Sequence, residues 1–188
     1  MEQISSDKYI IFLDVDGTVF DGKEVPKRTS DAVILARKLG HKVFINSGRA
    51  HCVIPDYILD NVSHDGVIGG MGTAITVGGK LIYSQIIDRD TVEFLLRFGE
   101  EHGYFTIAES IDRLFIMNGK QILNQKNFIN STDEFFEKYY SEQITKITFY
   151  NTVLPHSEID FLRRKVDNIY VLSDYVEIPA KNATRRLQ

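Results

Sequence analysis

The chain has 188 residues, with 22 basic and 26 acidic side chains and a net charge of −4. Its 43% hydrophobic content and mean hydropathy of −0.16 are those of an ordinary globular protein and exclude a disordered chain. The acidic balance gives no basic footprint for nucleic acid. The first apolar run, residues 9–13, is too short to span a bilayer, and no basic, apolar leader precedes it. We therefore expect a cytoplasmic protein that binds neither nucleic acid nor a membrane.

The first 70 residues predict alternating strands and helices. Residues 9–13 (YIIFL) are continuously apolar, which is typical of a strand buried on both faces. A helix is predicted from residue 29 until Gly40 ends it. Strands follow at Lys42–Asn46 and Gly66–Gly69, with a second helix between them that ends near residue 59. This βαβ series predicts a right-handed parallel sheet.

The pattern changes after residue 73. A hairpin is expected over residues 74–84, where Gly78 and Gly79 supply a tight turn. Helices are predicted over 88–102, 132–140 and 156–166, and strands over 104–108, 113–117, 146–150, 169–172 and 175–178. The fold class is therefore α/β: a Rossmann-like parallel-sheet domain of residues 1–80 and 174–188, interrupted by an α+β domain of residues 81–173.

Two carboxylates, Asp14 and Asp16, follow the first predicted strand in the sequence DVDGT. The carboxyl ends of parallel strands are where α/β folds bind ligands. A simple Asp-Gly turn would account for Gly17 alone. Glycoside hydrolysis also needs two acids, but on opposite sides of the bond, which residues i and i+2 of one strand end fit poorly. Phosphoryl transfer fits better, because one carboxylate can attack phosphorus, the other can handle protons, and Mg2+ can offset their repulsion.

The second predicted strand ends in a similar place, at the tripeptide Ser47-Gly48-Arg49. A hydroxyl and backbone amides at the start of the following helix would form an anion site, and Gly48 would permit close approach of a ligand. The two loops follow neighbouring strands, so the sequence predicts one phosphate site built from both.

The DVDGT and SGR motifs together resemble those of the haloacid dehalogenase superfamily of Mg2+-dependent phosphatases. The interruption near residue 80 is similar to that of its Cof-type branch (class IIB), which carries an inserted α+β cap. The resemblance covers residues 9–178 and implies a core sheet, a cap that closes over the substrate, and hydrolysis of small phosphorylated metabolites such as sugar phosphates through an aspartyl-phosphate intermediate.

The resemblance also implies residue roles. Asp14 corresponds to the nucleophile and a Mg2+ ligand, and Asp16 to the general acid/base, with its backbone carbonyl as a second ligand. Ser47 and Gly48 correspond to the phosphate-binding loop. The family's phosphate-neutralising lysine has two candidates in the tail, which are Lys181 and Arg185.

The tail departs from the family in another way, because no G-D-x-x-N-D segment follows residue 174. We therefore expect a C-terminally truncated member with an incomplete core, weak turnover and weak Mg2+ binding. An alternative is a silent remnant that binds a phosphorylated metabolite, or that assembles with copies of itself or with a complementing chain. A phosphomutase, which uses the same intermediate, is a third hypothesis.

Overall fold

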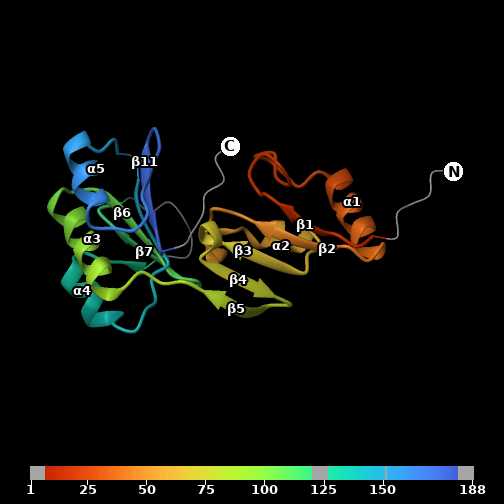
Figure 1. Ribbon diagram of the computed structural model, residues 1–188, viewed down its shortest axis with the longest axis horizontal. Helices are drawn as coiled ribbons and strands as arrows, with labels where there is room; N and C mark the ends of the chain where they lie inside the picture. The colour runs from red at the N-terminus through yellow and green to blue at the C-terminus, as the bar shows by residue number, and fades with distance from the viewer. Residues whose placement is uncertain (1–6, 120–126, 151, 182–188) are drawn as a thin grey trace.

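The computed structural model describes residues 7–119, 127–150 and 152–181 and consists of two lobes side by side (Figure 1). Each lobe is built on its own sheet and has its own cluster of buried apolar side chains. The first sheet has five strands in the order β1-β2-β3-β4-β5, and the second has six in the order β10-β11-β9-β6-β7-β8. The sheets do not divide at the predicted boundaries, because the strand Lys80–Ser84 belongs to the first sheet and the strand Tyr175–Pro179 belongs to the second.

The first sheet begins with the three parallel strands that the sequence predicts: β1 (Ile10–Leu13), β2 (Lys42–Asn46) and β3 (Gly66–Gly69). Helices α1 (Lys27–Lys38) and α2 (Asp56–Asn61) connect them. A hairpin of β4 (Ala74–Val77) and β5 (Lys80–Ser84) then adds two antiparallel strands. Because β1, β2 and β3 run in the same direction, the loops that follow them lie at one edge of the sheet.

The second sheet is antiparallel except for one strand pair. Its strands are β6 (Phe105–Glu109), β7 (Leu114–Met117), β8 (Asn127–Phe128), β9 (Lys146–Tyr150), β10 (Tyr170–Val171) and β11 (Tyr175–Pro179), with β7 and β8 parallel. Helices α3 (Arg89–Glu101), α4 (Thr132–Lys138) and α5 (His156–Arg163) cover its outer face (Figure 1). Its other face looks toward the first lobe.

Two predictions about strands are corrected. The chain was expected to return to the first domain at residue 174, but β11 pairs antiparallel with β9 inside the second sheet. Residues 182–188 of the predicted core lie outside the described residues. The run at residues 9–13 was expected to be buried on both faces, but Ile10 and Phe12 of β1 are 60% and 55% exposed. In the described part of the chain, β2 is the only strand paired with β1, and one face of β1 is left open to solvent.

Candidate active site at the strand ends

The loop after β1 carries the two acids and is anchored in the first core by buried valines. Val15 and Val19 are fully buried in the first core, whereas Asp16 between them is exposed. The turn closes through hydrogen bonds from Gly17 N to Phe20 O (2.9 Å) and from Phe20 N to Val15 O (2.9 Å). Gly17 adopts a φ of +78°, which favours glycine. The alternation of valine with aspartate therefore anchors the loop and turns Asp16 outward.

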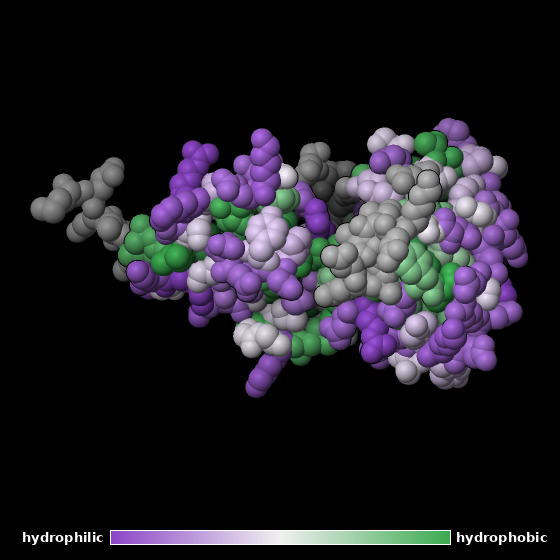
Figure 2. All heavy atoms as spheres, turned by 180° about the vertical axis from the view of Figure 1, so that it is seen from behind, coloured by the Kyte–Doolittle hydropathy of each residue, from purple (hydrophilic) through white to green (hydrophobic). Residues whose placement is uncertain are grey.

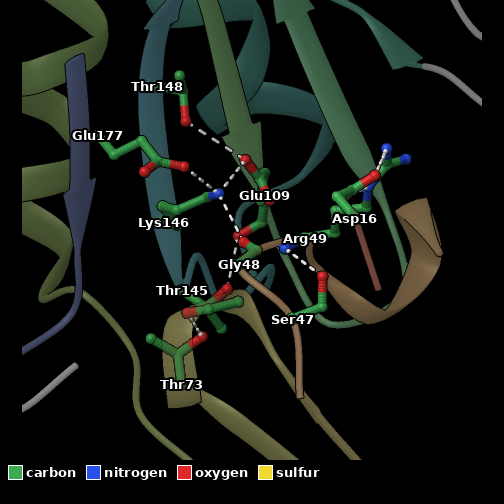
Figure 3. Close-up of polar contacts among 11 residues, drawn as sticks. Asp16, Ser47, Gly48, Arg49, Thr73, Glu109, Thr145, Lys146, Thr148 and Glu177 are labelled. Carbon is green, nitrogen blue, oxygen red and sulfur yellow. Dashed lines mark hydrogen bonds and ion pairs between the residues drawn. The ribbon is translucent and has the colours of Figure 1, made fainter. Parts of the chain in front are cut away.

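An ion pair joins this loop to the one after β2. The Arg49 guanidinium donates to both oxygens of Asp16, from Nε to Oδ2 at 2.9 Å and from Nη2 to Oδ1 at 2.8 Å (Figure 3). Such a bidentate pair fixes the relative orientation of the two groups. It confirms the prediction that the two motifs meet. Arg49 had no predicted role; the signal for it was its place in the second motif, directly after Gly48.

Ser47 and Gly48 form the floor of the second loop. Ser47 is buried, and its Oγ accepts a hydrogen bond from the Arg49 backbone N–H at 3.1 Å. Gly48 is exposed, and a Cβ added there would meet only the Met71 side chain, at 3.8 Å. The Gly48 backbone is therefore open to solvent, with room for a ligand to approach, at the position predicted to receive phosphate.

The turn after β3 donates hydrogen bonds to the backbone of the loop after β2. Gly70, Met71 and Gly72 all have positive φ values, of 59°, 62° and 88°. This tight turn directs Gly70 N to Arg49 O (2.7 Å) and Met71 N to Ser47 O (3.3 Å). Met71 is buried, so it supports the loop by packing against it.

Three buried charges lie together on the second sheet, and one of them, Lys146, contacts the same loop (Figure 3). The Lys146 ammonium lies 3.1 Å from Glu109 Oε1 and 2.9 Å from Glu177 Oε1, and it donates to Gly48 O at 3.0 Å. The side chains of Lys146, Glu109 and Glu177 are only 5%, 8% and 11% exposed, respectively. Burial raises the pKa of Glu109 in spite of Lys146. Burial acts to lower the pKa of Lys146, but the attraction of both carboxylates outweighs it and the pKa is raised. Sequence reasoning missed this cluster.

Of the two candidates for the phosphate-neutralising cation, Lys181 and Arg185, the structure describes Lys181. Lys181 forms an exposed ion pair with Asp167 of the second lobe, with Nζ 3.5 Å from Oδ1. That contact does not support a phosphate-binding role, and the prediction for Lys181 stays without support. Arg185 lies outside the described residues.

The donors available for Mg2+ are oxygens. No group of three or more His, Cys, Asp or Glu residues that could hold a metal ion is found within residues 7–119, 127–150 and 152–181. The Asp16 carboxylate is occupied by Arg49. Mg2+, however, is commonly bound through one or two carboxylates together with phosphate oxygens and waters. The Asp14 carboxylate and the Asp16 carbonyl fit such a partial donor set.

None of the described helices is long and apolar enough to cross a membrane.

Comparison with known proteins agrees with this architecture. A family model described as haloacid dehalogenase-like hydrolase matches residues 11–182. The Bacillus subtilis (strain 168) protein named "Putative phosphatase YkrA" is 26% identical over 151 residues, which cover 77% of this chain and 58% of that protein. The chain thus spans less than two thirds of the length of this relative.

Two solved structures share the fold. The HAD subclass IIB sugar phosphatase BT4131 superposes with a TM-score of 0.75 at 22% identity, covering 95% of this chain and 72% of that one. A haloacid dehalogenase-like hydrolase from B. subtilis gives a TM-score of 0.78 at 18% identity, covering 95% and 75%. Since the family model matches most of the sequence and the fold agrees, the chain belongs to the haloacid dehalogenase-like hydrolase family.

Proposed function

We propose that the chain hydrolyses small phosphomonoesters at the edge where β1 and β2 end. The observation that carries this proposal is the meeting of the two motif loops, joined by the bidentate contact between Arg49 and Asp16. This contact joins the loop that carries the two acids to the loop that carries Ser47 and the exposed Gly48 backbone, and transfer of a phosphoryl group needs such a combination of groups. Sugar phosphates are the first substrates to test, because BT4131 is described as a sugar phosphatase.

In the first step, an oxygen of the Asp14 carboxylate attacks phosphorus and the bond from phosphorus to the ester oxygen breaks. The Asp16 carboxyl gives its proton to the leaving oxygen. In the second step, Asp16 takes a proton from a water that attacks phosphorus, the bond between phosphorus and Asp14 breaks, and inorganic phosphate leaves.

The Arg49 contact constrains this cycle. Both Asp16 oxygens accept from Arg49, and a carboxylate so engaged accepts hydrogen bonds and donates none. Asp16 must therefore release at least one oxygen before it can carry the proton for the leaving group. We infer that this ion pair belongs to the resting state of the site.

Mg2+ is the proposed cofactor. The Asp14 carboxylate and the Asp16 carbonyl would hold it, and it would offset the negative charge of the phosphate and the carboxylates. Ser47 and the backbone at Gly48 would bind the phosphate oxygens.

The experiment is a hydrolysis assay on a panel of sugar phosphates and other phosphomonoesters, with Mg2+ and with EDTA. Asp14→Asn keeps the shape of the side chain but removes its nucleophilic charge, so turnover should fall to background. Asp56→Asn, a change to an exposed acid on α2, is the matched control and should retain turnover. Turnover by Asp14→Asn at the rate of the unmodified chain would refute the nucleophile assignment.

A binding protein without turnover is the alternative, and the Arg49 contact favours it because it holds both oxygens of the carboxyl that would carry the proton. It predicts that inorganic phosphate binds and that Ser47→Ala weakens this binding, while no substrate of the panel is hydrolysed. Mg2+-dependent hydrolysis well above background would reject it.

A further inference from the structure

The Lys146 ammonium has three oxygen partners. An ammonium group has three N–H donors; Gly48 O and Glu177 Oε1 accept hydrogen bonds from Lys146 at 3.0 and 2.9 Å, and Glu109 Oε1 forms an ion pair with it at 3.1 Å. Two of these partners belong to the second sheet, and the third is the backbone of the loop after β2. Lys146 therefore connects the second lobe to the candidate active site at a defined atom.

The sheet register places these charges together. Lys146 of β9 lies directly opposite Glu109 of β6. On its other side β9 pairs with β11, where Glu177 lies opposite Thr148, two residues beyond Lys146. Side chains two residues apart share one face of a strand, so the three charges lie on one face of three adjacent strands. The arrangement depends on the sheet itself and needs no flexible loop.

Three consecutive backbone carbonyls of the loop after β2 accept hydrogen bonds from outside the loop. Ser47 O and Arg49 O accept hydrogen bonds from Met71 N and Gly70 N. Between them, Gly48 O accepts from Lys146. Beyond them, the Ala50 backbone N–H lies near the Glu109 carboxylate and acts to lower its pKa. The turn after β3 thus holds the two outer carbonyls, and the charged cluster holds the carbonyl between them.

The Gly48 carbonyl and the Arg49 N–H belong to one peptide group. Because a peptide unit is planar, an interaction that fixes the direction of Gly48 O also fixes the direction of Arg49 N–H. That N–H donates to Ser47 Oγ at 3.1 Å. A continuous path therefore runs from the Lys146 ammonium, through one peptide plane, to the hydroxyl proposed to bind phosphate.

The charge balance argues against a direct role for Lys146 on the phosphate. Two buried carboxylates face a single ammonium, so the cluster as a whole brings no positive charge to the site. The ammonium already has three oxygen neighbours within 3.1 Å, two of them hydrogen-bond acceptors. The cluster therefore acts on the loop by fixing the direction of the Gly48 carbonyl.

We propose that Lys146, held by Glu109 and Glu177, is a positioning residue that orients the peptide between Gly48 and Arg49 and thereby the Ser47 hydroxyl for phosphate. The inference rests on the proposed function for its consequence, which is phosphate binding. It assigns to the second sheet a part in building the site on the first.

The main test is the triple variant K146M/E109Q/E177Q. It removes the donor to Gly48 without leaving an unpaired buried charge, which would itself unfold the chain. The E109Q change keeps a carbonyl oxygen near the Ala50 N–H, because a glutamine side chain still carries one. Thr148→Val is the matched control, since Thr148 contacts Glu109 (Oγ1 to Oε1, 3.4 Å) on the same face and makes no contact with the loop in the described structure.

Two quantities are measured on variants shown to be folded by circular dichroism. Titration calorimetry with inorganic phosphate and Mg2+ should give an affinity about ten- to a hundredfold weaker for the triple variant, as is typical when a supporting contact is lost. Hydrogen exchange over residues 47–50 should become faster. Thr148→Val should match the unmodified chain in both. A folded triple variant with unchanged affinity and unchanged exchange would overturn the inference.

If the triple variant does not fold, a second variant of Lys146 provides the test. Lys146→Arg keeps the charge and the ion pairs, but the planar guanidinium cannot reproduce the three-way geometry of the ammonium. Weaker phosphate binding and faster loop exchange support the inference, and unchanged values reject it.

Ser47→Ala separates the two proposals. If Ser47→Ala binds phosphate like the unmodified chain, or if neither binds it, the proposed function fails. The exchange measurement then still decides whether Lys146 orders the loop. If Ser47→Ala loses binding and the Lys146 variants do not, the inference alone fails.

Discussion

Gly48 has no conformational need to be glycine. Its φ is not among the positive values of the described glycines, and a Cβ would meet only Met71 Cγ at an ordinary contact distance of 3.8 Å. Gly66 is different, because a Cβ there would lie 2.1 Å from the Thr76 carbonyl oxygen. The reason for glycine at position 48 therefore lies in what approaches the loop from outside.

Gly48→Ala should fold normally and bind phosphate poorly. The free energy of unfolding should change by less than about 1 kcal/mol, because the folded chain has room for the methyl group. Inorganic phosphate should bind at least about tenfold more weakly. Thermal unfolding and calorimetry check the two parts.

The matched control is Gly66→Ala, which should lower the melting temperature sharply through its clash with the backbone. A Gly48→Ala chain that binds phosphate as tightly as the unmodified chain would contradict the assignment of this loop.

At this scale the sequence predicted the two motif loops and missed their support. Asp14, Asp16, Ser47 and Gly48 are predicted site residues because each pair follows a strand of the parallel series, and parallel strands end at one edge. Lys146 is 98 residues from the Gly48 carbonyl that it contacts. A single lysine at the start of an apolar strand carries no signal of its partners, so only the register of the second sheet could reveal the cluster.

Asp65 ties together three elements of the first lobe. It accepts hydrogen bonds from Arg37 of α1 (Nε, 3.2 Å; Nη2, 3.1 Å), from Lys42 Nζ (3.1 Å) and from Val43 N of β2 (2.9 Å), just before β3 begins. Burial acts to raise the pKa of Asp65, but the hydrogen bonds from Arg37, Val43 and Lys42 outweigh it and lower the pKa to about 2. This carboxylate therefore stabilises the fold only while it is ionised.

Asp65→Asn should destabilise the first lobe in a pH-dependent way. A lowered pKa in the folded state adds stability above the ordinary pKa, near 4, and this stability is lost as the pH falls through about 2. The variant should lose about 2 kcal/mol of unfolding free energy at pH 7, and the difference should shrink toward pH 2. Urea unfolding at several pH values measures it.

The control is Asp31→Asn, which removes an exposed i,i+4 pair with Lys27 on α1. Such pairs contribute about 0.3–0.5 kcal/mol, so the change should be small at every pH. A constant difference between Asp65→Asn and the unmodified chain from pH 7 to pH 2 would contradict the role of its charge.

At the scale of elements, local pattern predicted the strands and helices but not which sheet each strand joins. The predicted helix over 88–102 is α3, and Asp88 caps it by accepting from Thr91 N at 2.9 Å. The strand predicted at 175–178 exists as β11, yet it pairs with β9. The apolar residues of β11 suit a buried strand of either sheet, and only the pairing with Lys146–Tyr150 decides between them.

At the scale of the whole molecule, the outer end of the first sheet carries several exposed apolar side chains. Ile10 and Phe12 of β1 are exposed, as are Leu35 and Leu39 of α1. Figure 2 shows green, hydrophobic surface at this end, close to where the N-terminal trace leaves the described part. The side of β1 away from β2 has no strand partner in the described residues, so unpaired backbone groups lie beside these side chains.

An apolar strand with an open edge is a template for pairing with another chain. We expect the chain to self-associate reversibly through β1 as its concentration rises. Phe12→Lys places a charge on the open face of β1 and removes the ring contact with Phe44 at 5.9 Å. Because the Phe12 side chain is already 55% exposed, the variant should remain folded, and its sedimentation profile should shift toward the monomer. Val153→Lys is the control, since Val153 is an exposed apolar residue of the second lobe and lies on no described strand edge.

Equal association of Phe12→Lys and the unmodified chain in analytical ultracentrifugation would show that β1 is not the contact. A second outcome is informative: if added chains of another protein, but not copies of this one, bind and Phe12→Lys abolishes that binding, then β1 accepts a complementing strand.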